Sequence, residues 1–218
     1  MVSAPTADFR GPRRRLVEML QERGIHDLAV LRAFELTPRH LFVPSGIGHR
    51  AYEDAALPIG SGQTISQPSV HARYLEAIGF NGTERVLEVG TGSGYQTVLL
   101  AHLAGQVFSI ERIGALLERA RDAVRQCDVN NVSLLAGDGT LGWSAFAPYD
   151  AILVSAAAPS VPPPLVEQLA EGGRLLIPIG DQKDQTLRMY TKTGHGMQHR
   201  DVAAVRFVPL VGKFGWPG

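Results

Sequence analysis

Glycines and acidic side chains combine in residues 86–95, which read Val-Leu-Glu-Val-Gly-Thr-Gly-Ser-Gly-Tyr. Glycine lets a backbone turn tightly and approach a ligand closely, and a helix that starts after such a loop offers unpaired N–H groups. Glu88 precedes the glycines, and Glu111 follows Gly94 at about the distance that one helix and one strand require. Carboxylates bind ammonium groups and ribose hydroxyls well. The pattern therefore predicts a site for a small ligand that carries such groups.

The glycine spacing distinguishes two classes of cofactor. Gly90, Gly92 and Gly94 form G-x-G-x-G, whereas the dinucleotide fingerprint G-x-G-x-x-G needs a glycine where this chain has Tyr95. This spacing disfavours the alternative of an NAD-dependent oxidoreductase. An E-x-G-x-G-x-G pattern after a strand resembles motif I of S-adenosylmethionine-dependent methyltransferases with a Rossmann-like fold. An alternative role for Glu111 is to cap a helix that starts near residue 113.

From about residue 85 onward, short apolar runs alternate with helical patterns. This alternation predicts an α/β, doubly wound, mostly parallel sheet of seven strands with helices on both faces. The last two runs have no helix between them, which predicts an antiparallel element at the C-terminal end. The predicted strands cover residues 85–89, 106–110, 132–136, 151–155, 174–179, 186–191 and 202–210, and the predicted helices cover residues 96–104, 113–126 and 163–171.

The chain before residue 80 has a different pattern. Helical periods cover residues 12–23 and 28–36, and a stretch rich in glycine and proline follows from residue 44 to residue 68. Within this stretch, residues 57–68 have too few apolar side chains for a buried strand. Irregular segments of this size often act as lids or binding loops. We therefore expect a helical extension that ends in a loop over a binding site.

A length of 218 residues favours one domain over the whole chain, residues 1–218. We expect residues 1–80 to form the N-terminal helical extension with the substrate and cofactor loop. Residues 81–218 are expected to form the cofactor-binding core with the C-terminal strands. The sequence leaves the oligomeric state open, with a monomer as the simplest case.

Composition narrows the classes of partner. The 21 Lys and Arg residues balance 21 Asp and Glu residues, so no excess positive charge attracts nucleic acid or an anionic membrane. No apolar stretch reaches the roughly 18 residues of a membrane span. A single cysteine, Cys127, fits a reducing compartment, and we expect a cytoplasmic protein. We expect His195 and His199 to be loop residues, because helical periodicity and the glutamate of a zinc motif are missing, and no metal site is expected.

Several uncommon segments occur in one order along the chain. They are Thr-Pro-Arg-His-Leu-Phe-Val-Pro at 37–44, Ala-Tyr-Glu-Asp at 51–54, Gly-Gln-Thr-Ile-Ser-Gln-Pro at 62–68, the glycine motif, Ala-Ala-Ala-Pro at 156–159, and Val-Arg-Phe-Val-Pro-Leu at 205–210. Together they resemble the protein-L-isoaspartate O-methyltransferase family, over residues 13–212. The resemblance implies methyl transfer from S-adenosylmethionine to the free α-carboxylate of L-isoaspartyl residues in damaged proteins and peptides, leaving S-adenosylhomocysteine. The methyl ester then closes to a succinimide, which hydrolyses partly to normal aspartate.

The resemblance also implies roles for single residues. It makes Ser66 catalytic, with its hydroxyl beside the cofactor and the substrate carboxylate; the alternative is an N-cap of the following helix. It places Asp138 at the adenine, where the alternative is a tight turn. For His71 the alternative is a packed or surface residue. The implied cofactor-binding residues are Thr64, Ile65, Ser66, His71, Glu88, Gly90, Gly92, Gly94, Glu111, Asp138 and Gly139.

The implied acceptor needs no general base. A carboxylate with a pKa of about 3.5–4 is ionised at neutral pH and can attack the methyl group directly. An in-line approach of two opposite charges in a water-poor cleft favours the reaction. Motif I does not exclude a small-molecule acceptor, and a cofactor-binding interaction module without activity is a second alternative.

Overall fold

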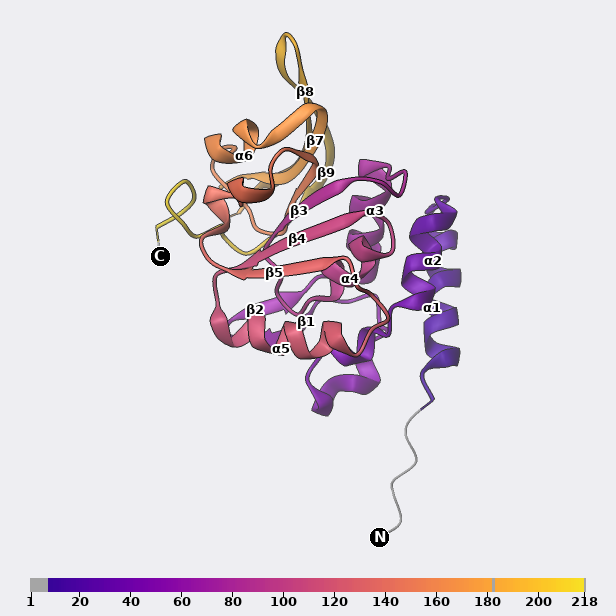
Figure 1. Ribbon diagram of the computed structural model, residues 1–218. Coiled ribbons are helices and arrows are strands. Elements are labelled where there is room, and N and C mark those ends of the chain that lie inside the picture. Colours follow the sequence, from indigo (N-terminus) through magenta and orange to yellow (C-terminus); the bar gives the residue numbers. More distant parts are fainter. Residues whose placement is uncertain (1–7, 182, 218) are drawn as a thin grey trace.

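The computed structural model describes residues 8–181 and 183–217, and its centre is a seven-stranded sheet (Figure 1). The strand order is β5-β4-β3-β6-β7-β8-β9. The five strands from β5 to β7 are parallel, and β8 is antiparallel to both of its neighbours. The predicted fold class is therefore confirmed. The strands are β3 (Arg85–Val89), β4 (Gln106–Glu111), β5 (Val132–Ala136), β6 (Tyr149–Val154), β7 (Leu169–Gly180), β8 (Gln185–Thr193) and β9 (Gly196–Val205).

Both faces of the sheet are buried at the central strands β3, β4 and β6, which explains their continuous apolar runs. Side chains alternate between the two faces along each strand. On β3, Val86 contributes to one core cluster, whereas Leu87 and Val89 contribute to the other. The first cluster also contains Leu20 and Phe34 from the N-terminal extension. The extension and the sheet thus share one core.

The two faces are covered differently. Five helices contribute buried residues to the first cluster: α1 (Arg10–Glu22), α2 (Leu28–Leu36), α3 (Pro68–Ile78), α4 (Tyr95–Ala101) and α5 (Gly114–Arg125). The second face is covered by shorter elements, and Leu165, Trp143 and Leu210 pack there. Leu165 lies in α6 (Pro163–Glu167), Trp143 lies between the 3-10 helices η3 (Gly139–Leu141) and η4 (Ser144–Phe146), and Leu210 lies in the C-terminal segment after β9. Two further 3-10 helices, η1 (Arg39–Phe42) and η2 (Ser45–Arg50), precede the first strand.

Several predicted boundaries are wrong near the C-terminal end, and the strand predicted over 174–179 already begins at Leu169. The helix predicted over 163–171 ends at Glu167, because Leu169 already pairs with Tyr149 of β6. The strand predicted over 202–210 is shifted, since β9 ends at Val205. Residues after β9 leave the sheet, and Pro209 forms an isolated bridge with Ala157. This exit brings the end of the chain to the carboxyl ends of the central strands.

Residues 57–68 contain a small hairpin where we expected an irregular loop. Strands β1 (Leu57–Gly60) and β2 (Gln63–Ile65) are antiparallel, and the turn between them includes Ser61 with a φ of 52°. Ile59 is 4% exposed, and its Cδ1 lies 3.5 Å from the position that a Cβ on Gly92 would occupy. One face of the hairpin, formed by Leu57, Ile59 and Ile65, is buried, and Ile59 packs over the glycine loop, a tertiary contact that the composition of the segment does not reveal.

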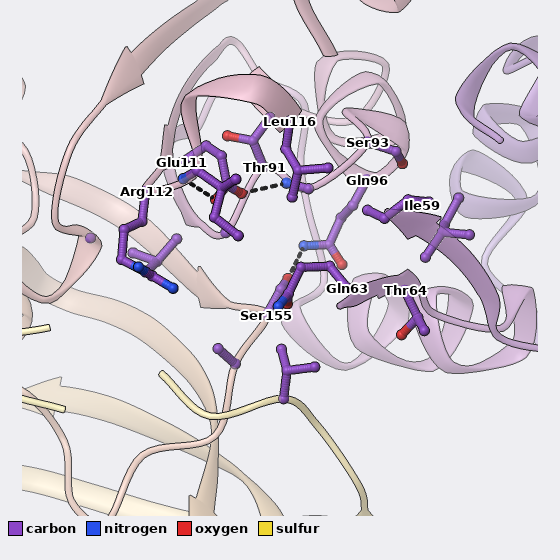
Figure 2. A pocket seen from close by; sticks show the side chains of 18 of the residues that line it. Ile59, Gln63, Thr64, Thr91, Ser93, Gln96, Glu111, Arg112, Leu116 and Ser155 are labelled. Carbon is purple, nitrogen blue, oxygen red and sulfur yellow. Dashed lines mark hydrogen bonds between the residues drawn. The ribbon is translucent and has the colours of Figure 1, made fainter. Parts of the chain in front are cut away.

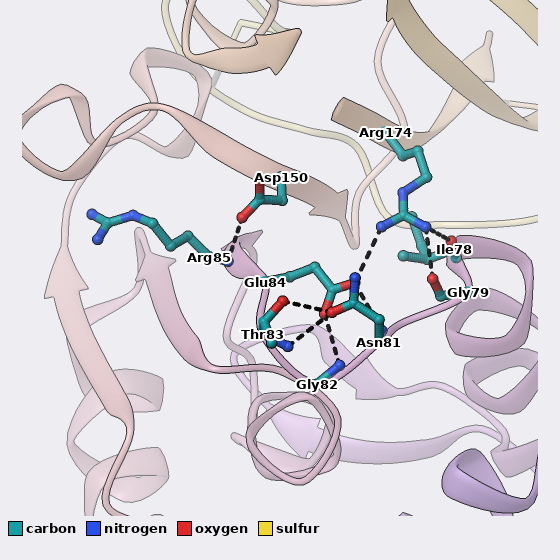
Figure 3. Close-up of polar contacts among 9 residues, drawn as sticks. All are labelled: Ile78, Gly79, Asn81, Gly82, Thr83, Glu84, Arg85, Asp150 and Arg174. Atoms are coloured by element: carbon teal, nitrogen blue, oxygen red, sulfur yellow. Dashed lines mark hydrogen bonds and ion pairs between the residues drawn. The ribbon is translucent and has the colours of Figure 1, made fainter. Parts of the chain in front are cut away.

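A polar network at the amino end of β3 ties α3 to the sheet (Figure 3). The guanidinium of Arg174 on β7 donates to the carbonyl oxygens of Ile78 at 2.5 Å and Gly79 at 2.6 Å. It also pairs with the Glu84 carboxylate at 3.3 Å. The same carboxylate accepts hydrogen bonds from two backbone N–H groups, those of Asn81 and Gly82. The guanidinium of Arg174 thus caps the C-terminal end of α3 and fixes this helix to the sheet.

The remaining composition-based expectations concern membranes and metals. No helix in the described part of the chain is long and apolar enough to cross a membrane. Within residues 8–181 and 183–217, no group of three or more His, Cys, Asp or Glu side chains is arranged to hold a metal ion. His199 lies in β9 beside the ring of Tyr190, with ring centroids 5.4 Å apart, so its predicted loop position is wrong.

Candidate active site

A cavity of about 300 Å³ lies at the carboxyl ends of β3, β4 and β6 (Figure 2). The strand order reverses between β3 and β6, and open α/β sheets bind ligands at such a point. The walls come from the glycine loop, the β1–β2 hairpin, the start of α3 and the C-terminal segment 208–211. Elements distant in the sequence therefore converge on one site.

Eight of the eleven predicted cofactor residues line this cavity, namely Thr64, Ile65, Ser66, His71, Gly90, Gly92, Glu111 and Gly139. The other three, Glu88, Gly94 and Asp138, are not among its lining residues. Sequence reasoning also missed lining residues, among them Gln96, Ser155 and Arg112. For Ser155 a signal existed, because a polar residue directly after a parallel strand lies at the ligand-binding edge of the sheet.

Glu111 is held in a fixed orientation at the end of β4. Its Oε2 accepts the N–H of Gly92 at 2.8 Å, and its Oε1 accepts the N–H of Ile113 at 2.8 Å. Ile113 is the N-cap residue of α5, and this helix has neither a side-chain cap nor an acidic residue in its first turn, so the alternative of Glu111 as a helix cap is wrong. The carboxylate is 7% exposed and lines the cavity as well. It can therefore offer remaining lone pairs to hydroxyl groups of a ligand.

Glu88 lies under the glycine loop and is fully buried. Its carboxylate accepts hydrogen bonds from Gln96 Nε2 at 3.0 Å, Ser109 Oγ at 2.6 Å and the Thr97 hydroxyl. Burial raises the pKa of Glu88 to about 7, although these hydrogen bonds act in the opposite direction. The hydrogen bonds of Glu88 thus connect β3 to α4, through Gln96 and Thr97, and to β4, through Ser109.

The glycines of the loop meet different constraints. Gly94 has a φ of 88°, and a Cβ there would lie 3.2 Å from Val124 Cγ2 on α5. Gly90 has a φ of 96°, and its Cβ would lie 3.5 Å from that of Ser155. Only glycine adopts such conformations without strain. Gly94 therefore allows α5 to pack closely against the glycine loop, whereas Gly90 leaves space beside Ser155 at the cavity.

Ser66 lines the cavity between β2 and α3. Its backbone carbonyl accepts a hydrogen bond from the Nη2 of Arg39 at 2.7 Å. Arg39 is fully buried, and its guanidinium lies 4.5 Å from the ring centroid of Tyr95. The alternative N-cap role is wrong, since Gln67 occupies that position without a side-chain cap. The buried side chain of Arg39 thus holds the segment that carries Ser66 in place.

His71 lies one turn into α3 and is packed as well as lining the cavity. Its ring meets that of Tyr95 edge-on at 5.5 Å. Burial, and then the charge of Arg39, lower the pKa of His71 to about 3, so the ring is neutral at physiological pH. No described residue hydrogen-bonds to its Nδ1 atom.

Asp138 forms the tight turn that was the alternative interpretation. Its carboxylate accepts the N–H and the hydroxyl of Thr140 at 2.9 and 2.7 Å, and the N–H of Lys213 at 2.8 Å. Although partial burial acts to raise it, these hydrogen bonds keep the pKa of Asp138 below its ordinary value. The neighbouring Gly139 does line the cavity, and a Cβ there would lie 2.4 Å from Val89 Cγ1.

Comparison with known proteins gives a consistent result. The model of the Protein-L-isoaspartate(D-aspartate) O-methyltransferase (PCMT) family matches residues 12–215. The protein-L-isoaspartate O-methyltransferase of Dictyoglomus thermophilum is 50% identical over 211 residues, which cover 97% of this chain and 96% of that protein. The protein-L-isoaspartate O-methyltransferase 1 of Syntrophobacter fumaroxidans is 49% identical, with 97% and 99% covered.

Solved structures agree with this result. One protein-L-isoaspartate O-methyltransferase has a TM-score of 0.84 and 31% identity, with 93% of this chain and 67% of that chain covered. A putative Plasmodium falciparum protein-L-isoaspartate O-methyltransferase in complex with S-adenosyl-L-homocysteine has a TM-score of 0.79 and 28% identity, with 91% and 98% covered. The chain therefore belongs to the protein-L-isoaspartate(D-aspartate) O-methyltransferase family.

Proposed function

We propose that the cavity binds S-adenosylmethionine and that the chain transfers its methyl group to the free α-carboxylate of L-isoaspartyl residues. Family membership makes the chain an S-adenosylmethionine-dependent protein-L-isoaspartate O-methyltransferase. The observation that supports this use of the cavity is the convergence of eight expected cofactor residues on one site at the carboxyl edge of the sheet.

The residues present fit this cofactor. Gly90 lets the backbone approach a ligand, since its missing side chain would fill space next to Ser155. His71 is buried, neutral and without a partner at Nδ1, which suits a ligand with both donors and acceptors. Glu111 would hold the ribose hydroxyls, and the backbone of Gly139 would adjoin the adenine. When bound, the cofactor supplies an electrophilic methyl group on a positively charged sulfur.

The chain's own residues provide positioning and exclusion of water. We assign to the Ser66 hydroxyl a hydrogen bond to one oxygen of the substrate carboxylate, which leaves the other oxygen directed at the methyl group. The bound cofactor would supply the methyl group to this oxygen and keep the electron pair of the methyl–sulfur bond, so the chain's residues would have no proton to move. The buried side chains of Ile59, Ile65 and Leu116 line the cavity and limit access of water to the reacting charges.

Replacement of Ser66 tests this assignment. Hydrogen bonds to charged groups contribute about 1.5–3 kcal/mol, so we expect Ser66→Ala to lower kcat/KM for an isoaspartyl peptide about 10- to 100-fold. Ser69→Ala is the matched control, because Ser69 is a buried serine of α3 that does not line the cavity. Full activity of Ser66→Ala, or an equal loss in Ser69→Ala, would contradict the proposed role.

The same assay separates the alternatives. Methyl transfer to small carboxylates without transfer to isoaspartyl peptides would indicate a small-molecule acceptor. Binding of S-adenosylhomocysteine in calorimetry without transfer to any acceptor would indicate an interaction module. The reducing, cytoplasmic location expected from Cys127 stays a prediction, which fractionation of cells that produce the protein can test.

A further inference from the structure

Helix α4 carries one polar side chain, Gln96, into the wall of the cavity. Gln96 is 5% exposed, and Figure 2 shows it beside Ser155. Its Nε2 donates to Glu88 Oε1 at 3.0 Å and to Ser155 Oγ at 2.9 Å. No described group donates to its Oε1 atom. Since buried polar atoms are normally hydrogen-bonded, an acceptor left without a donor at a cavity indicates that the ligand supplies the donor.

The hydrogen-bonding partners of Gln96 determine which atom of its side-chain amide, the nitrogen or the oxygen, has no partner. Above its pKa of about 7 Glu88 is ionised and only accepts hydrogen bonds, so it then selects the NH₂ group of the amide and leaves the oxygen for the cavity. Glu88 is in turn fixed by Thr97 and Ser109. The Oε1 acceptor is therefore oriented before any ligand binds, which lowers the entropic cost of using it.

The sheet order indicates which part of the cofactor meets Gln96. Glu111 ends β4 and Gly139 follows β5, whereas Gln96 bonds to Ser155 at the end of β6. Strands β5, β4, β3 and β6 are successive neighbours, about 4.8 Å apart. If the adenosine lies over β4 and β5, as proposed above, the amino-acid moiety extends toward β3 and β6. The donor of that moiety is its α-ammonium group, and the buried carboxylate of Glu88 behind Gln96 adds attraction for a cation.

We propose that Gln96 Oε1 accepts a hydrogen bond from the α-ammonium group of the cofactor, and that Ser155 donates its hydroxyl proton to the α-carboxylate of the same moiety. Ser155 can do so because its oxygen already accepts from Gln96 and its own proton has no described acceptor. The pair would recognise the two charges of the amino-acid moiety together. This inference rests on the proposed function, because it assumes that the cavity takes the adenosyl cofactor.

Calorimetry with two ligands tests the proposal without substrate peptide. S-adenosylhomocysteine contains the amino-acid moiety, whereas 5′-methylthioadenosine keeps the adenosine and the thioether but lacks that moiety. We expect Gln96→Leu to weaken S-adenosylhomocysteine about 10- to 100-fold, as for a hydrogen bond to a charged group. The affinity for 5′-methylthioadenosine should change less than about twofold. Gln96→Met is the second variant, in case leucine prevents folding.

Gln168→Leu is the matched control. It makes the same substitution at a second buried glutamine, whose side chain bonds to the backbone of Leu141 and Trp143 and does not line the cavity. We expect it to leave the preference for S-adenosylhomocysteine over 5′-methylthioadenosine unchanged. Equal losses for both ligands in the Gln96 variants, no loss for either, or the same selective loss in Gln168→Leu would overturn the inference. Failure of the unaltered chain to bind either ligand would instead overturn the proposed function.

Discussion

Two buried glutamates lie at opposite ends of β3, and they are satisfied in different ways. Glu84, just before the strand, pairs with the guanidinium of Arg174 and accepts backbone N–H groups (Figure 3). Glu88, near its carboxyl end, has only uncharged donors around it, and one of them, Gln96, keeps an unpartnered oxygen at the cavity. At the amino end, the charge of Glu84 is balanced by Arg174. At the carboxyl end, Glu88 has no positively charged partner, and the Gln96 Oε1 atom remains free to accept a hydrogen bond from a ligand.

The amino-end network should give the largest effect on stability. Arg174→Met removes the positive partner and leaves the carboxylate of Glu84 buried without it, which typically costs about 3–5 kcal/mol. Urea denaturation measures this loss of unfolding free energy. The affinity of the folded variant for S-adenosylhomocysteine should stay unchanged. A loss below about 1 kcal/mol, or a large change in affinity, would remove the distinction between the two ends.

The carboxyl-end network should respond to pH. The pKa of Glu88 is about 7 in the folded chain against an ordinary 4.5. The folded state therefore holds the proton more strongly, and the associated stability is present below pH 4.5 and is lost as pH rises through 7. The difference corresponds to roughly 3 kcal/mol.

Glu88→Gln cannot titrate and isolates this contribution. We expect the unfolding free energy of the unaltered chain, minus that of Glu88→Gln, to fall between pH 4.5 and 7 and to level off above pH 7.5. Other ionisable groups are common to both proteins, so their contributions cancel to first order. A difference that is flat with pH would show that Glu88 stays ionised throughout.

Gly139 offers a smaller and more local test at the carboxyl end. A Cβ at this position would lie 2.4 Å from Val89 Cγ1, so Gly139→Ala should cost about 1–3 kcal/mol through overpacking. The double variant with Val89→Ala removes the clashing atom and should recover part of the affinity for S-adenosylhomocysteine that the single variant loses. Thermal melts and calorimetry measure the two effects. Simple additivity of the two substitutions would rule out the steric explanation.

Local patterns were sufficient to predict the central strands. β3 begins and ends where its apolar run predicts, and β4 differs by one residue at its end, because a strand buried on both faces needs a continuous apolar sequence. Tertiary contacts decided the remainder. Ile59 of the β1–β2 hairpin is buried where it packs over Gly92, and the helix that begins at Pro163 is cut short by the pairing of Leu169 with β6.

The site residues divide in the same way, into those that local sequence predicts and those that tertiary contacts fix. Glycine spacing and the position of Glu111 were readable, because they depend on short segments of chain. The inward orientation of Glu88 was not, since it depends on Thr97 and Ser109, whose hydroxyls carry no sequence signal of their own. Gln96 escaped prediction for a related reason: its free oxygen becomes visible only when both partners of its NH₂ group are known.

The most direct test of the central claim uses two synthetic peptides that differ only in an isoaspartyl or an aspartyl linkage, together with S-adenosylmethionine labelled in its methyl group. We expect base-labile label in the isoaspartyl peptide alone, with an equal amount of S-adenosylhomocysteine formed. Equal labelling of both peptides, or label that resists mild base and is therefore no methyl ester, would contradict it.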